Sequence, residues 1–317
     1  MHAAVVHSFG QPPRFEQFPT PTAVGPHDEV VDVIATGLHP RLRSQADGSH
    51  YTATDELPLI PGIDGVGRRA DGSLVYFVLP DTTLGAMAEH TVIDGRRSIA
   101  LPVNADPVLL AAAMNPAMSS WIALTRRIDF APGSSVLVLG ATGSAGQLAI
   151  QIARHLGASR VVAAGRGSEK LAALDADATI DLSADADAVA RELGEKAADV
   201  DVVLDYLWGP PTELALMPLL LARTDRSRLL SWIEIGSVAG PDIALPSAAL
   251  RQANVQFLGS GQGSVSAAGI LESLPELVDL IDRNTFAIET VTLPLRDVET
   301  AWAAEPRDAN ARVVIAP

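Results

Sequence analysis

The sequence contains no cysteine, so it has no disulfide, no thiolate nucleophile and no cysteine–zinc site. Basic residues are few, with 23 Lys and Arg against 38 Asp and Glu, and the formal net charge of −15 argues against nucleic acid or an anionic membrane as a partner. No apolar run approaches the roughly 20 residues of a membrane span, and no signal-peptide pattern opens the chain. We therefore expect a cytoplasmic protein. Aromatic residues make up only 4%, which is more typical of an α/β enzyme than of a β-sandwich.

The length of 317 residues is enough for two domains, each with its own core. In the first hundred residues, Asp28 to Thr36 alternates apolar and polar residues as a half-exposed strand does, and Leu57 to Arg68 is dense in the glycine and proline of a small barrel. From Asp106 onward, strand-like and helical segments alternate, which favours a doubly wound parallel sheet. The last apolar segment, Arg312 to Ile315, is predicted to return to the β-rich beginning.

The parallel sheet is predicted to contain six strands. They are Val136 to Leu139, Arg160 to Ala164, Ala178 to Leu182, Asp201 to Asp205, Arg228 to Ile235 and Val255 to Leu258. The predicted helices include Pro107 to Leu124, Ala145 to Leu156, Asp185 to Leu193, Thr212 to Ala222 and Ala267 to Arg283.

A glycine-rich turn separates the first of these strands from its helix, and the helix ends near Gly157. Gly143 lets the backbone approach a pyrophosphate, and Gly146 lets the helix pack closely on the strand. The helix N-terminus adds free N–H groups and partial positive charge. Ala141 replaces the first glycine of the usual fingerprint, with Gly140 one place earlier. This context predicts a dinucleotide site that includes Ala141, Thr142, Gly143, Ser144, Ala145 and Gly146.

The residue after the second strand indicates which dinucleotide is bound. An NAD site usually has Asp or Glu there to hold the ribose 2′-hydroxyl. This chain has Arg166, with Ser168 and Lys170 close behind. Because a carboxylate repels a 2′-phosphate and an arginine binds it through paired hydrogen bonds, the segment favours NADPH over NADH.

Other segments extend this pattern over the whole chain: Met1 to Gly10, Pro61 to Gly67, and less specifically Leu245 to Ser247 and Gly259 to Gly263. Together with the glycine fingerprint, they resemble the medium-chain dehydrogenase/reductase superfamily in its zinc-independent quinone oxidoreductase branch. The resemblance implies a Rossmann doubly wound parallel sheet, residues 117–263, inserted into a β-rich GroES-like catalytic domain. That domain is formed by residues 1–116 and completed by residues 264–317. The resemblance also implies a homodimer.

Metal binding is not expected. In the zinc-dependent relatives, Gly-His-Glu stands where this chain has Gly62, Ile63 and Asp64. The resemblance also places a catalytic cysteine near His39, and none is present. Only His39 and Asp64 remain as possible metal ligands, whereas catalytic zinc sites usually need three protein ligands.

The resemblance also implies several active-site contacts. His39 lies where quinone reductases often carry an asparagine near the nicotinamide, and it either orients that ring, supplies a proton, or is a barrel-loop histidine with a backbone partner. Ser119 matches a hydroxyl residue that touches the nicotinamide amide in the family. Tyr51, in the loop after His39, is expected to line the substrate pocket.

The carboxyl edge of the predicted sheet contributes the remaining candidates. Tyr206 and Trp208 follow the fourth strand, where they flank cofactor and substrate respectively or pack as a lid. Ser237, Gly259 and Ser260 follow the fifth and sixth strands and are expected on the cofactor side.

The resulting hypothesis is an NADPH-dependent oxidoreductase that transfers a hydride to a quinone or other α,β-unsaturated carbonyl, without zinc. A non-catalytic NADPH-binding sensor or structural protein is the alternative, because the asparagine and aromatic residue usual near the nicotinamide are missing. The sequence does not identify the physiological acceptor.

Overall fold

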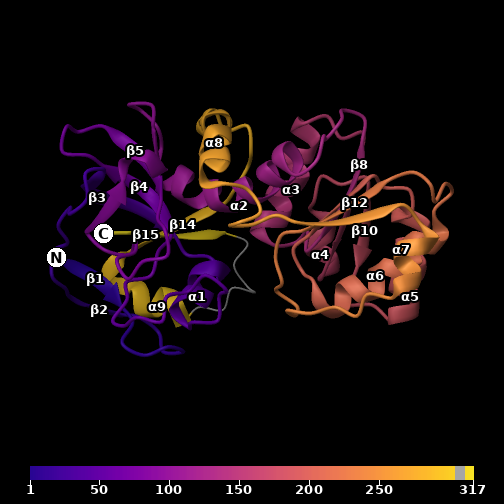
Figure 1. Ribbon diagram of the computed structural model, residues 1–317, viewed down its shortest axis with the longest axis horizontal. Helices are drawn as coiled ribbons and strands as arrows, with labels where there is room; N and C mark the ends of the chain where they lie inside the picture. The colour runs from indigo at the N-terminus through magenta and orange to yellow at the C-terminus, as the bar shows by residue number, and fades with distance from the viewer. Residues whose placement is uncertain (304–310) are drawn as a thin grey trace. The chain divides into compact units, whose positions relative to one another are not determined.

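The computed structural model describes residues 1–303 and 311–317, which divide into two compact units. One unit comprises Met1–Asn115 and Leu271–Pro317, and the other comprises Pro116–Ile270. Each unit is built around its own sheet, so the chain combines a β-rich part with an α/β part, as the sequence predicts (Figure 1).

The first unit is mainly β. Its largest sheet runs in the order β14-β15-β3-β4-β5-β7, with β6 also paired to β3, and β1 and β2 form a separate hairpin. The strands are β1 (His2–Val5), β2 (Arg14–Gln17), β3 (Asp28–Gly37), β4 (Asp64–Arg68), β5 (Leu74–Val78), β6 (His90–Asp94), β7 (Ser98–Ala100), β14 (Thr290–Pro294) and β15 (Arg312–Ala316). Ile315 pairs with Thr36, which confirms that the C-terminal strand returns to this sheet.

Two larger apolar clusters, together with a small one of Val6, Ala46 and Leu59, form the core of this unit. One is centred on β1, Leu42 and Met87, and the other contains the inward side chains of β3 and β5, such as Val31 and Phe77. The turn before β4 requires glycine, because Gly62 has φ +124° and a Cβ there would lie 2.4 Å from the Ala86 nitrogen.

The segment after His39 is helical, whereas the sequence analysis treats it as a loop. The helix α1 (Pro40–Ala46) begins with proline in its first turn, where proline is well tolerated, and buries Leu42, Gln45 and Ala46. The 3-10 turns η1 (Gly95–Arg97) and η2 (Leu295–Asp297) and helix α9 (Val298–Ala303) complete the unit.

The second unit is a six-stranded parallel sheet in the order β10-β9-β8-β11-β12-β13. Its strands are β8 (Ser135–Leu139), β9 (Arg160–Gly165), β10 (Ala178–Asp181), β11 (Val202–Asp205), β12 (Leu230–Glu234) and β13 (Val255–Gly259). Its helices are α3 (Ser144–His155), α4 (Ser168–Ala172), α5 (Ala186–Ala197), α6 (Gly209–Ala222) and α7 (Ser247–Gln252). Helices α5, α6 and α7 pack their apolar residues on one face of the sheet, around Trp232 (Figure 1).

Helices α2 (Pro107–Arg126) and α8 (Ala267–Asp282) each begin in one unit and end in the other. Helix α2 corrects one statement of the sequence analysis, because it is long and apolar enough to cross a membrane, with a mean hydropathy of 1.4. However, 67% of this segment is buried inside the protein. A core helix of a globular protein passes the same test of length and composition.

Candidate functional site

The strand order of the second unit reverses between β8 and β11. Chain connections leave the sheet in opposite directions from such a point, which opens a crevice at the carboxyl ends of the two strands. The loops that follow β8 and β11 meet there. The Tyr206 nitrogen donates to the Leu139 oxygen at 3.1 Å, and a Cβ built on Gly140 would lie 3.2 Å from the Tyr206 Cβ.

The glycines of the turn after β8 have different structural roles. Gly140 has φ +92°, so the turn itself depends on a residue that adopts positive φ easily. A Cβ on Gly146 would lie 2.3 Å from the Gly140 oxygen, which only displacement of helix α3 could relieve. Gly143 is exposed, has φ −82°, and a Cβ there would meet only the Gly140 oxygen, at 3.6 Å. The protein's own packing therefore explains glycine at 140 and 146 but leaves Gly143 unexplained.

Helix α3 presents its first turn beside Gly143. Gly143 is the N-cap and makes no side-chain capping bond, so the N–H groups of Ser144, Ala145 and Gly146 have no partner within the helix. Ala141 is fully buried under the turn, and Thr142 lies half-buried against β9, where a Cβ on Gly165 would be 2.8 Å from its methyl group. These donors, together with the space over Gly143, fit the pyrophosphate of a dinucleotide.

The end of β9 carries the residues predicted to select the cofactor. Arg166, Ser168 and Lys170 are all exposed, and Ser168 begins helix α4 after Gly167. The Arg166 guanidinium makes no hydrogen bond or ion pair with the residues that the structure describes. Its five N–H donors are therefore available to a phosphate.

Two residues predicted to contact the cofactor, Ser119 and Tyr206, are hydrogen-bonded to each other through their hydroxyl groups. Ser119 donates to the Pro116 oxygen at 2.6 Å, and its Oγ lies 3.0 Å from the Tyr206 hydroxyl. Burial raises the pKa of Tyr206 to about 12, so its hydroxyl is protonated at neutral pH and donates to Ser119. Tyr206 lies in the loop after β11 and Ser119 in helix α2, and their cofactor contacts stay predictions.

The turn after β11 is held by a buried carboxylate that the sequence analysis did not single out. Asp205 is fully buried and its Oδ1 accepts the N–H groups of Leu207 and Trp208 at 2.9 and 3.0 Å. Its Oδ2 accepts the Thr212 hydroxyl at 2.6 Å and the Trp232 indole N–H at 2.9 Å. These bonds hold Trp208 at φ +52°, a backbone conformation that a bulky residue rarely adopts. The sequence feature that could have revealed this network is an acidic residue at the end of an apolar strand.

The predicted contacts on the next two strands lie along the same edge. Ser237 is exposed after β12, whereas Ser260, after β13, is only 9% exposed and its nitrogen donates to the Glu234 oxygen at 2.8 Å. The Gly259 oxygen accepts from Arg127 at 2.8 Å, which fixes the last turn of this edge.

In the first unit, His39 belongs to a buried polar cluster. Its Nε2 lies 3.3 Å from Oδ1 of Asp64, and the Tyr76 hydroxyl donates to Oδ2 of Asp64 at 2.6 Å. Arg312, on β15, is 8% exposed and its charge acts on both Asp64 and His39. His39 and Asp64 are candidates from the sequence, whereas Tyr76 and Arg312 are not recognisable as members of the cluster, because residues so far apart in the chain meet only when the sheet forms.

Tyr51, the predicted wall of the substrate pocket, is 73% exposed and stacks on His50 with ring centroids 4.5 Å apart. Arg41 reaches His50 and Thr52. Burial, together with the Arg41 charge, lowers the pKa of His50 to about 4. His50 is therefore neutral at neutral pH.

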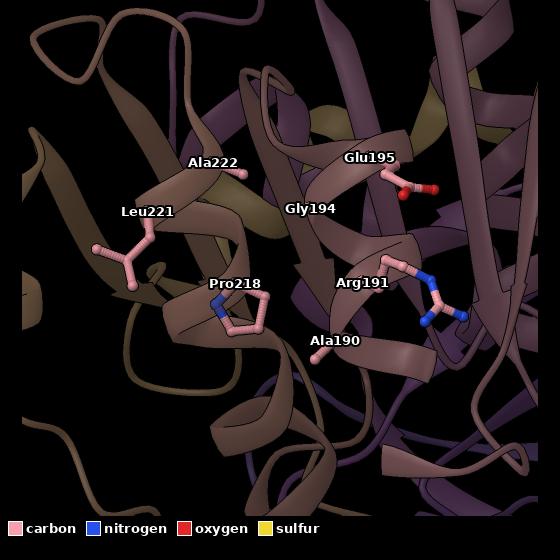
Figure 2. A pocket seen from close by; sticks show the side chains of 7 residues that line it. All are labelled: Ala190, Arg191, Gly194, Glu195, Pro218, Leu221 and Ala222. Carbon is pink, nitrogen blue, oxygen red and sulfur yellow. The ribbon is translucent and has the colours of Figure 1, made fainter. Parts of the chain in front are cut away.

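A shallow depression of about 470 Å³ lies elsewhere on the second unit, between helices α5 and α6. Figure 2 shows its lining, Ala190, Arg191, Gly194 and Glu195 on α5 and Pro218, Leu221 and Ala222 on α6. Because α6 runs away from the carboxyl edge, its last turn lies toward the opposite edge of the sheet. This depression is therefore separate from the glycine turn.

The second unit has a parallel sheet with a glycine-rich turn at the point where its strand order reverses, and the same chain contains a β-rich unit. This combination is the architecture of the quinone oxidoreductase fold. No protein-family model matches the chain. The "Probable NADPH-dependent quinone reductase tdiC" of Emericella nidulans is 29% identical over the full length of both chains. The quinone oxidoreductase of Thermus thermophilus, solved also with NADPH, is 26% identical and superposes with a TM-score of 0.83 over the full length of both chains.

Two further likenesses are narrower. The Escherichia coli quinone oxidoreductase complexed with NADPH shares the fold, with a TM-score of 0.82 at 18% identity over the full length of both chains. The chloroplastic NADPH-dependent alkenal/one oxidoreductase of Arabidopsis thaliana is 29% identical over 48% of this chain and 44% of its own length. The chain is therefore similar in sequence to NADPH-dependent quinone and alkenal oxidoreductases, and its structural neighbours are quinone oxidoreductases.

Proposed function

We propose that the protein is an oxidoreductase that transfers a hydride from NADPH to a quinone or another α,β-unsaturated carbonyl, without zinc. The observation that carries this proposal is the pair formed by the open Gly143 turn at the N-terminus of α3 and by Arg166 at the end of β9, which is unpaired among the described residues. One feature suits a pyrophosphate and the other a 2′-phosphate. The full-length likeness to NADPH-dependent quinone reductases supports the same assignment.

The bound cofactor supplies the hydride, and the protein's own residues supply orientation and charge. The N–H groups that open α3 hold the pyrophosphate beside Gly143, and Arg166, with Ser168 and Lys170, holds the 2′-phosphate. Ser237, Gly259 and Ser260 extend this edge along the sheet. Ser119 and Tyr206 fix the wall of the crevice through their shared hydrogen bond.

Zinc is not part of the proposed reaction. The chain has no cysteine, and residues 1–303 and 311–317 contain no group of three or more His, Asp or Glu placed to hold a metal ion. An acceptor that stabilises charge by its own conjugation needs no Lewis acid. Quinones and enones are therefore favoured over simple ketones as acceptors.

Initial rates of NADPH oxidation with a panel of quinones, enals, enones and simple alcohols test the proposal. We expect turnover with conjugated carbonyls only, unchanged after treatment with a zinc chelator. Tight NADPH binding without oxidation by any acceptor would indicate the non-catalytic sensor instead. Oxidation of simple alcohols, lost on chelation together with one zinc per chain, would contradict the proposal directly.

Replacing Arg166 by alanine should weaken NADPH binding by roughly 1–3 kcal/mol, because a charge-assisted contact to the 2′-phosphate is lost. NADH lacks that phosphate, so its dissociation constant should hardly change. Fluorescence titrations with both cofactors measure the difference, and Arg191→Ala, at an exposed position in the middle of α5, is the matched control. An equal loss for NADPH and NADH would mean that Arg166 only shapes the loop.

We also propose a cytoplasmic homodimer. The cytoplasmic location is supported by the lack of cysteine, and the homodimer by the family resemblance. Sedimentation analysis of the purified chain measures the oligomeric state.

A further inference from the structure

The outward face of helix α6 is apolar, although the helix lies on the surface of the second unit. Every residue from Leu214 to Ala222 is apolar. The inward side chains pack around Trp232, whereas Leu221 is 45% exposed and Ala222 is also exposed. A surface helix normally carries polar residues on its outward face, and a helix that is apolar on all sides is normally buried. Within the part of the chain that the structure describes, nothing buries this face of α6.

The depression of about 470 Å³ between α5 and α6 adjoins this apolar face. Its middle is lined by small residues, Ala190, Gly194 and Ala222, and a Cβ on Gly194 would lie 3.3 Å from the Ala222 Cβ. Figure 2 shows Leu221 on one side of the depression and two charged side chains of α5 extending from the other side, away from α6. The depression is thus open to side chains of a partner, with an apolar side and a charged side.

The two charged residues, Arg191 and Glu195, lie one helical turn apart and are both exposed. Neither makes a hydrogen bond or an ion pair with the residues that the structure describes. Their neighbours Glu192 and Lys196 already pair with each other at 2.8 Å. The segment from Ala190 to Ala197 therefore carries no net charge. The whole chain carries −15, so most of its surface repels a second copy, whereas this segment does not.

Opposite charges one turn apart on a helix are self-complementary. A twofold contact places the same surface of each chain against the other, so every pair of contacting residues occurs twice. When two α5 helices lie antiparallel across such an axis, Arg191 of each chain faces Glu195 of the partner subunit. The same symmetry brings the two apolar α6 faces together and covers Leu221.

We propose that the α5–α6 face binds a second copy of this chain, with antiparallel α5 helices, two reciprocal Arg191–Glu195 ion pairs, and Leu221 buried against α6 of the partner subunit. Burial of the apolar surface supplies the driving force, and the ion pairs fix the orientation. This inference rests on the proposed homodimer, and it does not depend on the proposed hydride transfer.

Charge reversal tests the symmetric pairing by sedimentation velocity. Arg191→Glu and Glu195→Arg each replace two ion pairs by two like-charge contacts, so each variant alone should raise the dissociation constant of the dimer at least roughly 100-fold. An equimolar mixture of the two variants should form dimers again, because every contact then joins opposite charges. An effect confined to one helix is not rescued by mixing. Asp175→Arg, at an exposed acidic position outside this face, is the matched control.

A second pair of variants tests the apolar contact. Leu221→Ser should raise the dissociation constant of the dimer roughly 10-fold, because two partly exposed leucines lose their burial in each dimer. Leu250→Ser removes a leucine of similar exposure, 49%, on α7 and outside the depression. It should leave the dissociation constant unchanged.

The outcomes separate the interface from the proposed homodimer. A wild-type dimer that Arg191→Glu, Glu195→Arg and Leu221→Ser all leave unchanged would keep the homodimer and overturn this interface. Charge-reversal variants that dissociate but do not recover on mixing would overturn the reciprocal pairing. A wild-type chain that is monomeric at every concentration would mean that another partner, or none, covers the face, and both the interface and the homodimer would be wrong. The hydride transfer would still stand or fall on the rates of NADPH oxidation.

Discussion

Replacing Asp205 by alanine should lower the free energy of unfolding by roughly 3–5 kcal/mol, a loss at the upper end of what single substitutions cause. The change strands four donors at once: two backbone N–H groups, the Thr212 hydroxyl and the Trp232 indole N–H. Relief of the unfavourable φ of +52° at Trp208 offsets only part of this cost. Urea denaturation followed by tryptophan fluorescence measures the loss in the transition that reports on Trp232.

Two further variants make this measurement specific to the network. Thr212→Val removes one donor at nearly constant volume and should cost only about 1 kcal/mol. Asp175→Ala, at an exposed acidic position of the same unit, should change stability by less than about 0.5 kcal/mol. Equal, small effects of all three would show that the Asp205 hydrogen bonds contribute little to stability.

Segments whose structure follows from local patterns were predictable from the sequence. The apolar run at Val136, the helical spacing that ends at Gly157 and the next apolar run match β8, α3 and β9 within a residue or two. Each of these elements buries a continuous stripe of side chains, so periodicity alone identifies it. The third to sixth strands of the parallel sheet are confirmed for the same reason.

Short elements without a full apolar period were not predictable. Helices α1 and α7 span one to two turns, and the strand β14 pairs in parallel with β15 across a long connection. Tertiary packing fixes such pieces, and a single sequence does not display it.

The candidate site divides in the same way. The glycine turn and Arg166 are consecutive in one β-α-β unit, so spacing reveals them. The Asp205 network and the cluster of His39, Asp64, Tyr76 and Arg312 join side chains from distant strands. Whether a buried acidic residue is paired depends on neighbours that only the folded sheet brings together.

The last prediction uses two glycines of one turn as each other's control. Gly143→Ala should leave the stability of the protein within about 0.5 kcal/mol of wild type, because Gly143 has φ −82° and a Cβ there meets only one atom, at 3.6 Å. The same methyl group would occupy the space over the α3 N-terminus where we place the pyrophosphate. NADPH affinity should therefore fall at least about tenfold, a loss of about 1.4 kcal/mol or more.

Gly146→Ala should show the reverse order of effects. Its Cβ would lie 2.3 Å from the Gly140 oxygen and 2.6 Å from the Ala141 Cα, so helix α3 must move away from β8 and the thermal midpoint should drop by several degrees. Binding should fail as a consequence of that movement. Thermal unfolding and NADPH titration of both variants measure the contrast. If the Gly143→Ala variant binds NADPH as tightly as the wild type does, the pyrophosphate does not lie over this turn, and the proposed pyrophosphate site is wrong.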